Sequence, residues 1–192
     1  MAASRVTHNT GVALAGAAAV AAAVSAGIDG ATVADAVQVA ADAAARAVRR
    51  GHWVAAADVG SRITWAAGLI AGLGTGHVMD LVYRLVGASL ATQESVPAAF
   101  ALAAACPKEP WLACRMAASL GGDCDTIAAM TGAICGACHG AGAFPETARA
   151  TVASVIWPLR RIVEGILYVD RTGCAWRYLP SDFRPGGRVP RA

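Results

Sequence analysis

Apolar residues recur at helical spacing over most of the chain. The clearest run begins after Thr32 and places apolar side chains on one helical face, at Val33, Val37, Ala40, Ala44 and Val48. Thr32 and Asp35 have the spacing of a capping box at the start of this helix. Arg46, Arg49 and Arg50 followed by Gly51 are typical of a helix end. The pattern predicts a helix that runs from about residue 33 to residue 48.

Other segments have the same character, and Gly, Pro or Asp residues separate them. We expect further helices at about residues 11–26, 54–71, 77–87, 95–105, 110–119 and 125–139. The glycine-rich residues 72–76 neither follow a strand nor complete a dinucleotide-binding pattern, so they predict a turn between helices. Because no stretch alternates as a strand does, the predicted fold class is all-α, a helical bundle.

Composition supports packed helices. Hydrophobic residues make up 56% of the 192 residues and the mean hydropathy is +0.49, but the excess is mostly alanine. The apolar run from Gly11 to Ala26 imitates a secretory signal, yet it is shorter than the roughly 20 residues of a comfortable membrane span. Six scattered cysteines have no framework spacing. We therefore expect a cytoplasmic protein with reduced thiols and no membrane segment.

Charge divides the chain near Ser154. Residues 1–155 carry nine Lys or Arg against ten Asp or Glu, whereas residues 156–192 carry seven arginines against three acids. Aromatic residues are also enriched in this tail, and alanine nearly disappears. Such a break indicates a change of module. We predict one domain over residues 1–154 and a separate basic segment over residues 155–192.

The strongest chemical signal lies around Asp123, Asp125 and Thr126. Gly121 and Gly122 break the preceding helix, and two carboxylates and a hydroxyl then open the next one. These hard oxygen donors are the ligands that Mg²⁺ or Mn²⁺ prefers. The alternative is that one aspartate only caps the helix, which requires a single acid. The pattern alone leaves both interpretations open.

The segment from Gly121 to Ala133, and on to Gly140, resembles the C-terminal metal motif of the ADP-ribosylglycohydrolase family. That family includes the hydrolase that reactivates dinitrogen reductase. The Gly-Gly-Asp-x-Asp-Thr core is the specific part of the match. Residues 93–99 and the Thr7-His8 pair resemble two further landmarks, in the correct order. The resemblance covers about residues 5–153.

The resemblance implies an all-α fold around two Mg²⁺ ions that bind ADP-ribose and activate water. The implied reaction is hydrolysis of the glycosidic bond between ADP-ribose and a modified residue or small molecule. Carried over by position, Asp123, Asp125 and Thr126 are metal ligands. His8 and Gly122 are implied to lie near the bound ADP-ribose. No catalytic residue is assigned by the resemblance.

One departure limits the predicted activity. The family's remaining ligands come from adjacent aspartates early in its sequence, and this chain has no Asp-Asp pair. Two carboxylates and a hydroxyl cannot hold two divalent ions in a dedicated geometry. We therefore interpret the chain as the C-terminal portion of such a hydrolase, with weak Mg²⁺ binding and no appreciable turnover alone.

Cys135, Cys138 and His139 form a C-x-x-C-H sequence, the pattern of covalent haem attachment. The competing interpretation places the three side chains structurally, on the helix that follows the aspartates. A zinc site built on the same residues lacks a visible fourth ligand. We favour the structural interpretation and expect no haem.

The basic tail resembles the N-terminal domain of an insertion-element transposase, chiefly in residues 172–177. No transposase acidic triad follows it, which excludes transposition chemistry. Its arginines suit phosphate contacts but also an ordinary solvated surface. The alternative function is therefore a DNA-binding remnant, with weak contacts through residues 156–192, fused to a non-catalytic helical scaffold.

Overall fold

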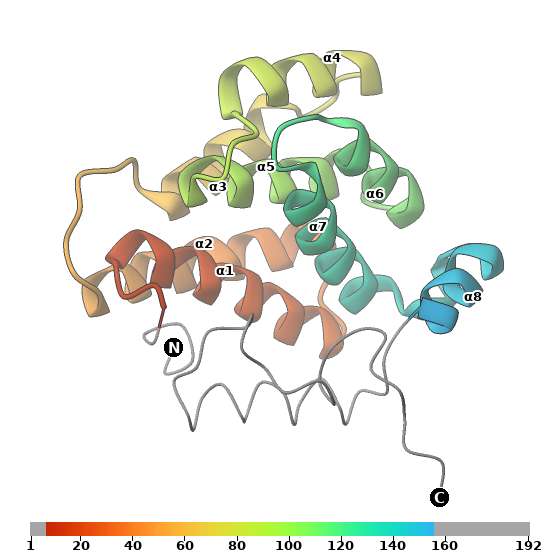
Figure 1. Cartoon of the computed structure of the whole chain (residues 1–192), viewed down its shortest axis with the longest axis horizontal. Helices are drawn as coiled ribbons and strands as arrows, with labels where there is room; N and C mark the ends of the chain where they lie inside the picture. Colours follow the sequence, from red (N-terminus) through yellow and green to blue (C-terminus); the bar gives the residue numbers. More distant parts are fainter. Residues whose placement is uncertain (1–6, 156–192) are drawn as a thin grey trace, which may run out of the picture. The chain divides into compact units, whose positions relative to one another are not determined.

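A computed structural model describes residues 7–155, which are mostly helical and include no strand. The chain divides into two compact units, Met1–Pro145 and Glu146–Ala192. The first unit contains α1 (Gly11–Ile28), α2 (Val33–Ala47), α3 (Val59–Leu69), α4 (Thr75–Leu81), α5 (Thr92–Ala105), α6 (Pro110–Ser119) and α7 (Cys124–His139). Short helical turns lie at Val48–Arg50, Val82–Val86 and Ala141–Ala143, and the second unit contributes α8 (Glu146–Val155). The predicted all-α class is confirmed (Figure 1).

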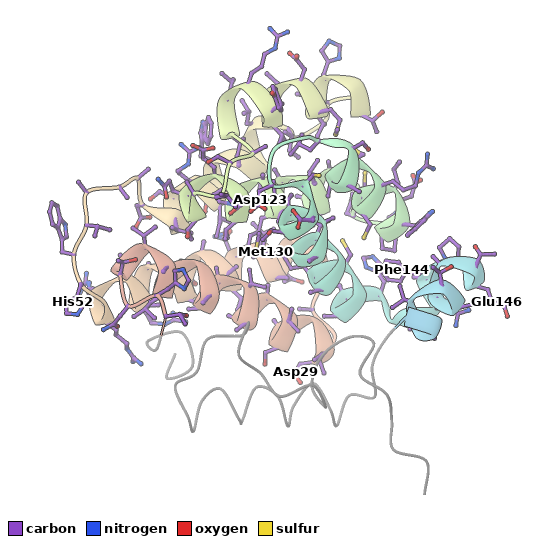
Figure 2. The ribbon with its side chains drawn as sticks, viewed as in Figure 1. Asp29, His52, Asp123, Met130, Phe144 and Glu146 are labelled. Atoms are coloured by element: carbon purple, nitrogen blue, oxygen red, sulfur yellow. The ribbon has the colours of Figure 1, made fainter. Side chains whose placement is uncertain are left out.

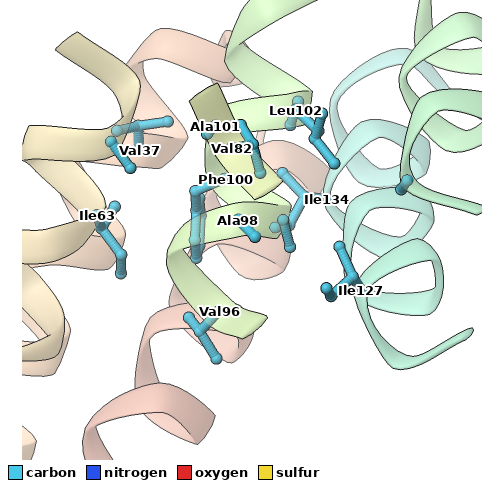
Figure 3. Close-up of a cluster of buried hydrophobic side chains, with 14 of the residues drawn as sticks. Val37, Ile63, Val82, Val96, Ala98, Phe100, Ala101, Leu102, Ile127 and Ile134 are labelled. Carbon is cyan, nitrogen blue, oxygen red and sulfur yellow. The ribbon is translucent and has the colours of Figure 1, made fainter. Parts of the chain in front are cut away.

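Helix α5 lies at the centre of the first unit, and every residue from Ser95 to Ala103 is buried. It packs against α3, α6 and α7, and against α1 and α2. Phe100 and Leu102 are fully buried among Ile63 of α3 and Ile134 of α7 (Figure 3). Alanine fills most remaining core positions, so the helix axes approach closely and small side chains suffice to exclude water.

The predicted capping box starts α2. The Asp35 N–H donates to the Thr32 hydroxyl oxygen at 3.2 Å, and the Thr32 N–H donates to the Asp35 carboxylate at 3.2 Å. The helix ends near Val48 as expected, but Gly51 is not a left-handed cap because its φ is −107°. A Cβ on Gly51 would lie 2.5 Å from the Gly11 nitrogen, so the glycine allows close chain approach instead.

The structure departs from the prediction before α3 and after α7. The helix expected at 54–71 begins only at Val59, because the Asp58 carboxylate accepts the Ser61 N–H at 2.7 Å and sets the N-terminus there. The three alanines at 55–57 are therefore left in an exposed loop despite their helix propensity. Helix α8 lies beyond the predicted helices, although its first turn carries Glu146.

Helix α1 has no charged residue, and only part of its surface is buried. Its length and mean hydropathy of 2.0 would allow it to cross a membrane, a property that core helices of soluble proteins share. Leu14, Ala15, Ala19 and Ala23 are buried, and the helix packs chiefly on α2 and α7. Within the first unit it therefore serves as a core helix with one uncovered face.

Candidate functional site

A double-glycine turn positions the predicted metal ligands. Gly121 and Gly122 have φ values of +88° and +64°, a region that residues with a Cβ rarely adopt. A Cβ on Gly122 would also lie 2.1 Å from the Ala88 carbonyl oxygen. The same oxygen accepts the Asp123 N–H at 2.7 Å. The turn is thus docked onto the loop that precedes α5, and only glycine fits at residue 122.

The Asp123 side chain does not cap α7. Asp123 occupies the N-cap position, yet its carboxylate accepts no backbone N–H of the helix. It accepts the Thr126 hydroxyl instead, at 2.9 Å from Oδ1. Asp125 lies exposed in the first turn of α7. Of the two interpretations that the sequence left open, this geometry does not support capping.

A cavity of about 520 Å³ lies beside this turn. Asp123 and Thr126 line it together with His8, so three of the five predicted site residues meet there. Gly122 is next to Asp123 in the sequence and Asp125 is next to Thr126, but neither Gly122 nor Asp125 lines the cavity. Figure 2 shows Asp123 at the start of α7 and Met130, another lining residue, further along the same helix. The other walls are largely apolar, formed by small residues of α1 with Leu90 and Val96.

Within residues 7–155, neither carboxylate of the turn, Asp123 or Asp125, forms an ion pair with a described residue. Two carboxylates two residues apart, with a hydroxyl beside one of them, attract a small cation with a preference for oxygen. The donors therefore fit a divalent cation chemically. The described residues contain no group of three His, Cys, Asp or Glu side chains that could enclose one.

Comparison with known proteins identifies the family. Residues 1–172 match the ADP-ribosylglycohydrolase family. The chain belongs to the ADP-ribosylglycohydrolase family. A relative in Escherichia coli (strain K12), described as "Uncharacterized protein YegU", is 36% identical over 154 residues. That alignment covers 80% of this chain and 46% of the relative, so the chain spans about half the relative's length. No solved structure matches.

Sequence reasoning missed Arg62 of α3. Its guanidinium donates from Nε to the Gln93 carbonyl and from Nη2 to the Val86 carbonyl, both at 2.6 Å. These carbonyls flank the loop on which the Asp123 turn docks. Pro97 is the signal that could have indicated this contact, since proline leaves the carbonyl four residues earlier without its helical partner. In this member of the glycohydrolase family, an arginine supplies that partner.

In the C-x-x-C-H sequence, the His139 ring makes hydrogen-bond contacts with backbone carbonyls, and Cys135 is part of the core. The two ring nitrogens of His139 lie 2.9 Å from the carbonyl oxygens of Cys135 and Pro107. Cys135 is fully buried, and burial, with the neighbouring thiols, raises its pKa to about 12. Both haem attachment and zinc binding require accessible donors. The geometry therefore favours the structural interpretation of these residues.

The predicted transposase-like segment, residues 155–192, lies outside the described residues apart from its first residue. Its proposed DNA contacts through residues 156–192 fall there too. The family match continues to residue 172.

Proposed function

We propose that the Asp123 turn binds a divalent cation and presents it to ADP-ribose in the adjoining cavity. The observation that carries the proposal is that Asp123, Thr126 and His8 line the same cavity in a chain of this family. Asp123, Asp125 and Thr126 would hold Mg²⁺. When bound, Mg²⁺ supplies charge that orients a ribose diol or diphosphate and acidifies water.

The cavity walls suggest how a nucleotide would lie. Asp123 and Thr126 form its polar side, next to the cation, and the His8 imidazole can donate to or accept from a hydroxyl. Met130, Leu90 and Val96 give an apolar surface against which a flat base can pack. The volume of about 520 Å³ lies within the range of ordinary small-molecule sites.

The donor set also limits the reaction. Residues 7–155 offer two carboxylates and one hydroxyl at the turn, and no enclosing third acid. Two ions need more oxygen ligands than this turn provides. We therefore propose weak Mg²⁺ binding and glycosidic hydrolysis that is negligible for this chain alone.

Isothermal titration with ADP-ribose, with and without Mg²⁺, tests the proposal. We expect Mg²⁺-dependent binding that the Asp123→Ala/Asp125→Ala variant weakens by about 10-fold or more, since even residues behind the ligands contribute that much. Asp42→Ala is the matched control, because Asp42 is an exposed single aspartate within α2. Binding that ignores Mg²⁺, or that survives the double substitution, would disprove the assignment.

A further inference from the structure

Arg62 connects three segments that are distant in sequence. It lies on α3, and its two hydrogen bonds reach the end of the turn Val82–Val86 and the first turn of α5. The Val86 carbonyl lies just before the loop of residues 87–91, and the Gln93 carbonyl lies just after it. One planar guanidinium thus fixes both ends of this loop, a geometry that suits a rigid fork of donors.

Local chemistry explains why the Gln93 carbonyl accepts from Arg62. Pro97 has no N–H, so Gln93 lacks its helical donor and its carbonyl is free for Arg62 Nε. The guanidinium carbon also lies 5.2 Å from the centroid of the Trp65 ring, one turn along α3. This cation–π contact holds the guanidinium in place.

Glu94 fixes the interior of the same loop. Its Oε2 accepts the Ser89 N–H at 3.1 Å. Gly87, with φ of +91°, leaves room for this carboxylate, since a Cβ there would lie 2.4 Å from Oε2. Ala88 is therefore held between Gly87, whose N–H donates to the Val82 carbonyl at 2.9 Å, and Ser89, whose N–H donates to Glu94.

The Ala88 carbonyl then orients the Asp123 turn. It accepts the Asp123 N–H at 2.7 Å, and a side chain at residue 122 would collide with it. We infer that Arg62, with Glu94, is a positioning residue for the Asp123 carboxylate, acting through the Ala88 carbonyl. The inference rests on the proposed function only in so far as Asp123 binds the cation.

Amide hydrogen exchange of the full chain tests the inference without any metal. In Arg62→Gln, we expect the Asp123 N–H to exchange at least several-fold faster relative to the Ala40 N–H of α2. General loss of stability would accelerate both amides alike, whereas loss of positioning acts on Asp123 selectively. Equal acceleration of both amides, or an unchanged Asp123 rate, would overturn the inference.

Matched variants complete the design. Arg84→Gln removes an exposed arginine whose partner is Asp80, and it should leave the Asp123 rate unchanged. Arg62→Lys retains the charge but cannot span both carbonyls as a fork, so it should fall between the wild type and Arg62→Gln. If Arg62→Gln does not fold, the Arg62→Lys exchange ratio decides in its place, and a wild-type ratio contradicts the inference.

Mn²⁺ titration, followed by electron paramagnetic resonance, separates this inference from the proposed function. We expect Arg62→Gln to weaken Mn²⁺ binding by up to about 10-fold, the low end of the effect of groups behind a metal's ligands. If wild-type protein binds no Mn²⁺, the proposed function fails while the exchange result still judges the role of Arg62. If Mn²⁺ binds equally to both proteins, the positioning role for the cation is wrong.

Discussion

At the residue scale, Gly122 combines two constraints that can be tested together. Gly122→Ala puts a side chain at φ of +64° and 2.1 Å from the Ala88 oxygen. We expect a loss of at least about 2 kcal/mol in the free energy of unfolding, because backbone strain of this kind alone costs about 1–3 kcal/mol. Urea denaturation of the variant and the wild type measures this difference in the free energy of unfolding.

Gly68→Ala is the control for this substitution. Gly68 lies within α3, and nothing lies within 4 Å of an added Cβ. Replacing a helical glycine with alanine usually adds about 0.5–1 kcal/mol of stability. A Gly122→Ala protein that is as stable as the wild type would contradict the close docking of the turn on Ala88.

The Cys135 thiol gives a second prediction at this scale. Burial, with the nearby thiols of Cys114, Cys138 and Cys106, raises its pKa to about 12, so at pH 8 almost none of it is thiolate. We expect iodoacetamide to modify the half-buried Cys124 of the native protein while Cys135 stays unmodified. Cys124 and Cys135 lie on the same tryptic peptide, residues 116–149, so tandem mass spectrometry of that peptide measures the modification at each site. Equal rates in folded protein would contradict the burial of Cys135.

Individual site residues were only partly predictable from the sequence. The Asp123, Asp125 and Thr126 cluster is visible because hard donors at the start of a helix are unusual in an alanine-rich chain. The contact between Thr126 and Asp123 was not visible, and neither was the role of Arg62. A hydrogen bond from an arginine to backbone carbonyls 24 and 31 residues away leaves no local pattern in the sequence.

At the element scale, the start of α2 makes stability depend on pH. Hydrogen bonds from the Thr32 hydroxyl and then from the Thr32 N–H hold the pKa of Asp35 below its ordinary value of 3.8. A lowered carboxyl pKa means that the folded state favours the charged form. The stabilising effect of the charged Asp35 carboxylate is therefore complete above about pH 3.8, and it is lost as the pH falls through the pKa of Asp35 in the folded state.

Thr32→Ala should remove this dependence. We expect the variant to be less stable than the wild type at pH 6, and the difference to shrink as the pH falls below 3.8. Urea denaturation across this range, with an NMR titration of Asp35, measures both effects. A stability difference that is constant with pH would show that the carboxylate contributes nothing.

The helices themselves were largely predictable, because capping residues and proline act locally. Thr32 set the start of α2, and Pro110 set the start of α6. The loop before α3 was not predicted because the helix propensity of three alanines competes there with the Asp58 cap. The helix predicted over residues 77–87 is interrupted at the turn Val82–Val86, in which Val82 and Val86 are both buried, and local sequence signals do not report such packing.

At the scale of the whole molecule, the all-α class and the family followed from the sequence, whereas the arrangement of the site did not. His8 and Asp123 meet at one cavity because α1 packs along α7, a contact between segments more than a hundred residues apart. Helical periodicity shows which face of α1 is apolar, but not which helix it packs against. The family resemblance was needed to associate the two.

The docking of the Asp123 turn on Ala88 also bears on the order of folding. Helices α1 and α2 are joined by a short, capped connection and can pair early, because little chain entropy is lost in closing that loop. The turn needs α3, the loop before α5 and α7 already in place, so it should close last and open first. Mild heat or denaturant should therefore abolish ligand binding at the site at a point where most of the helix content of the protein is still present.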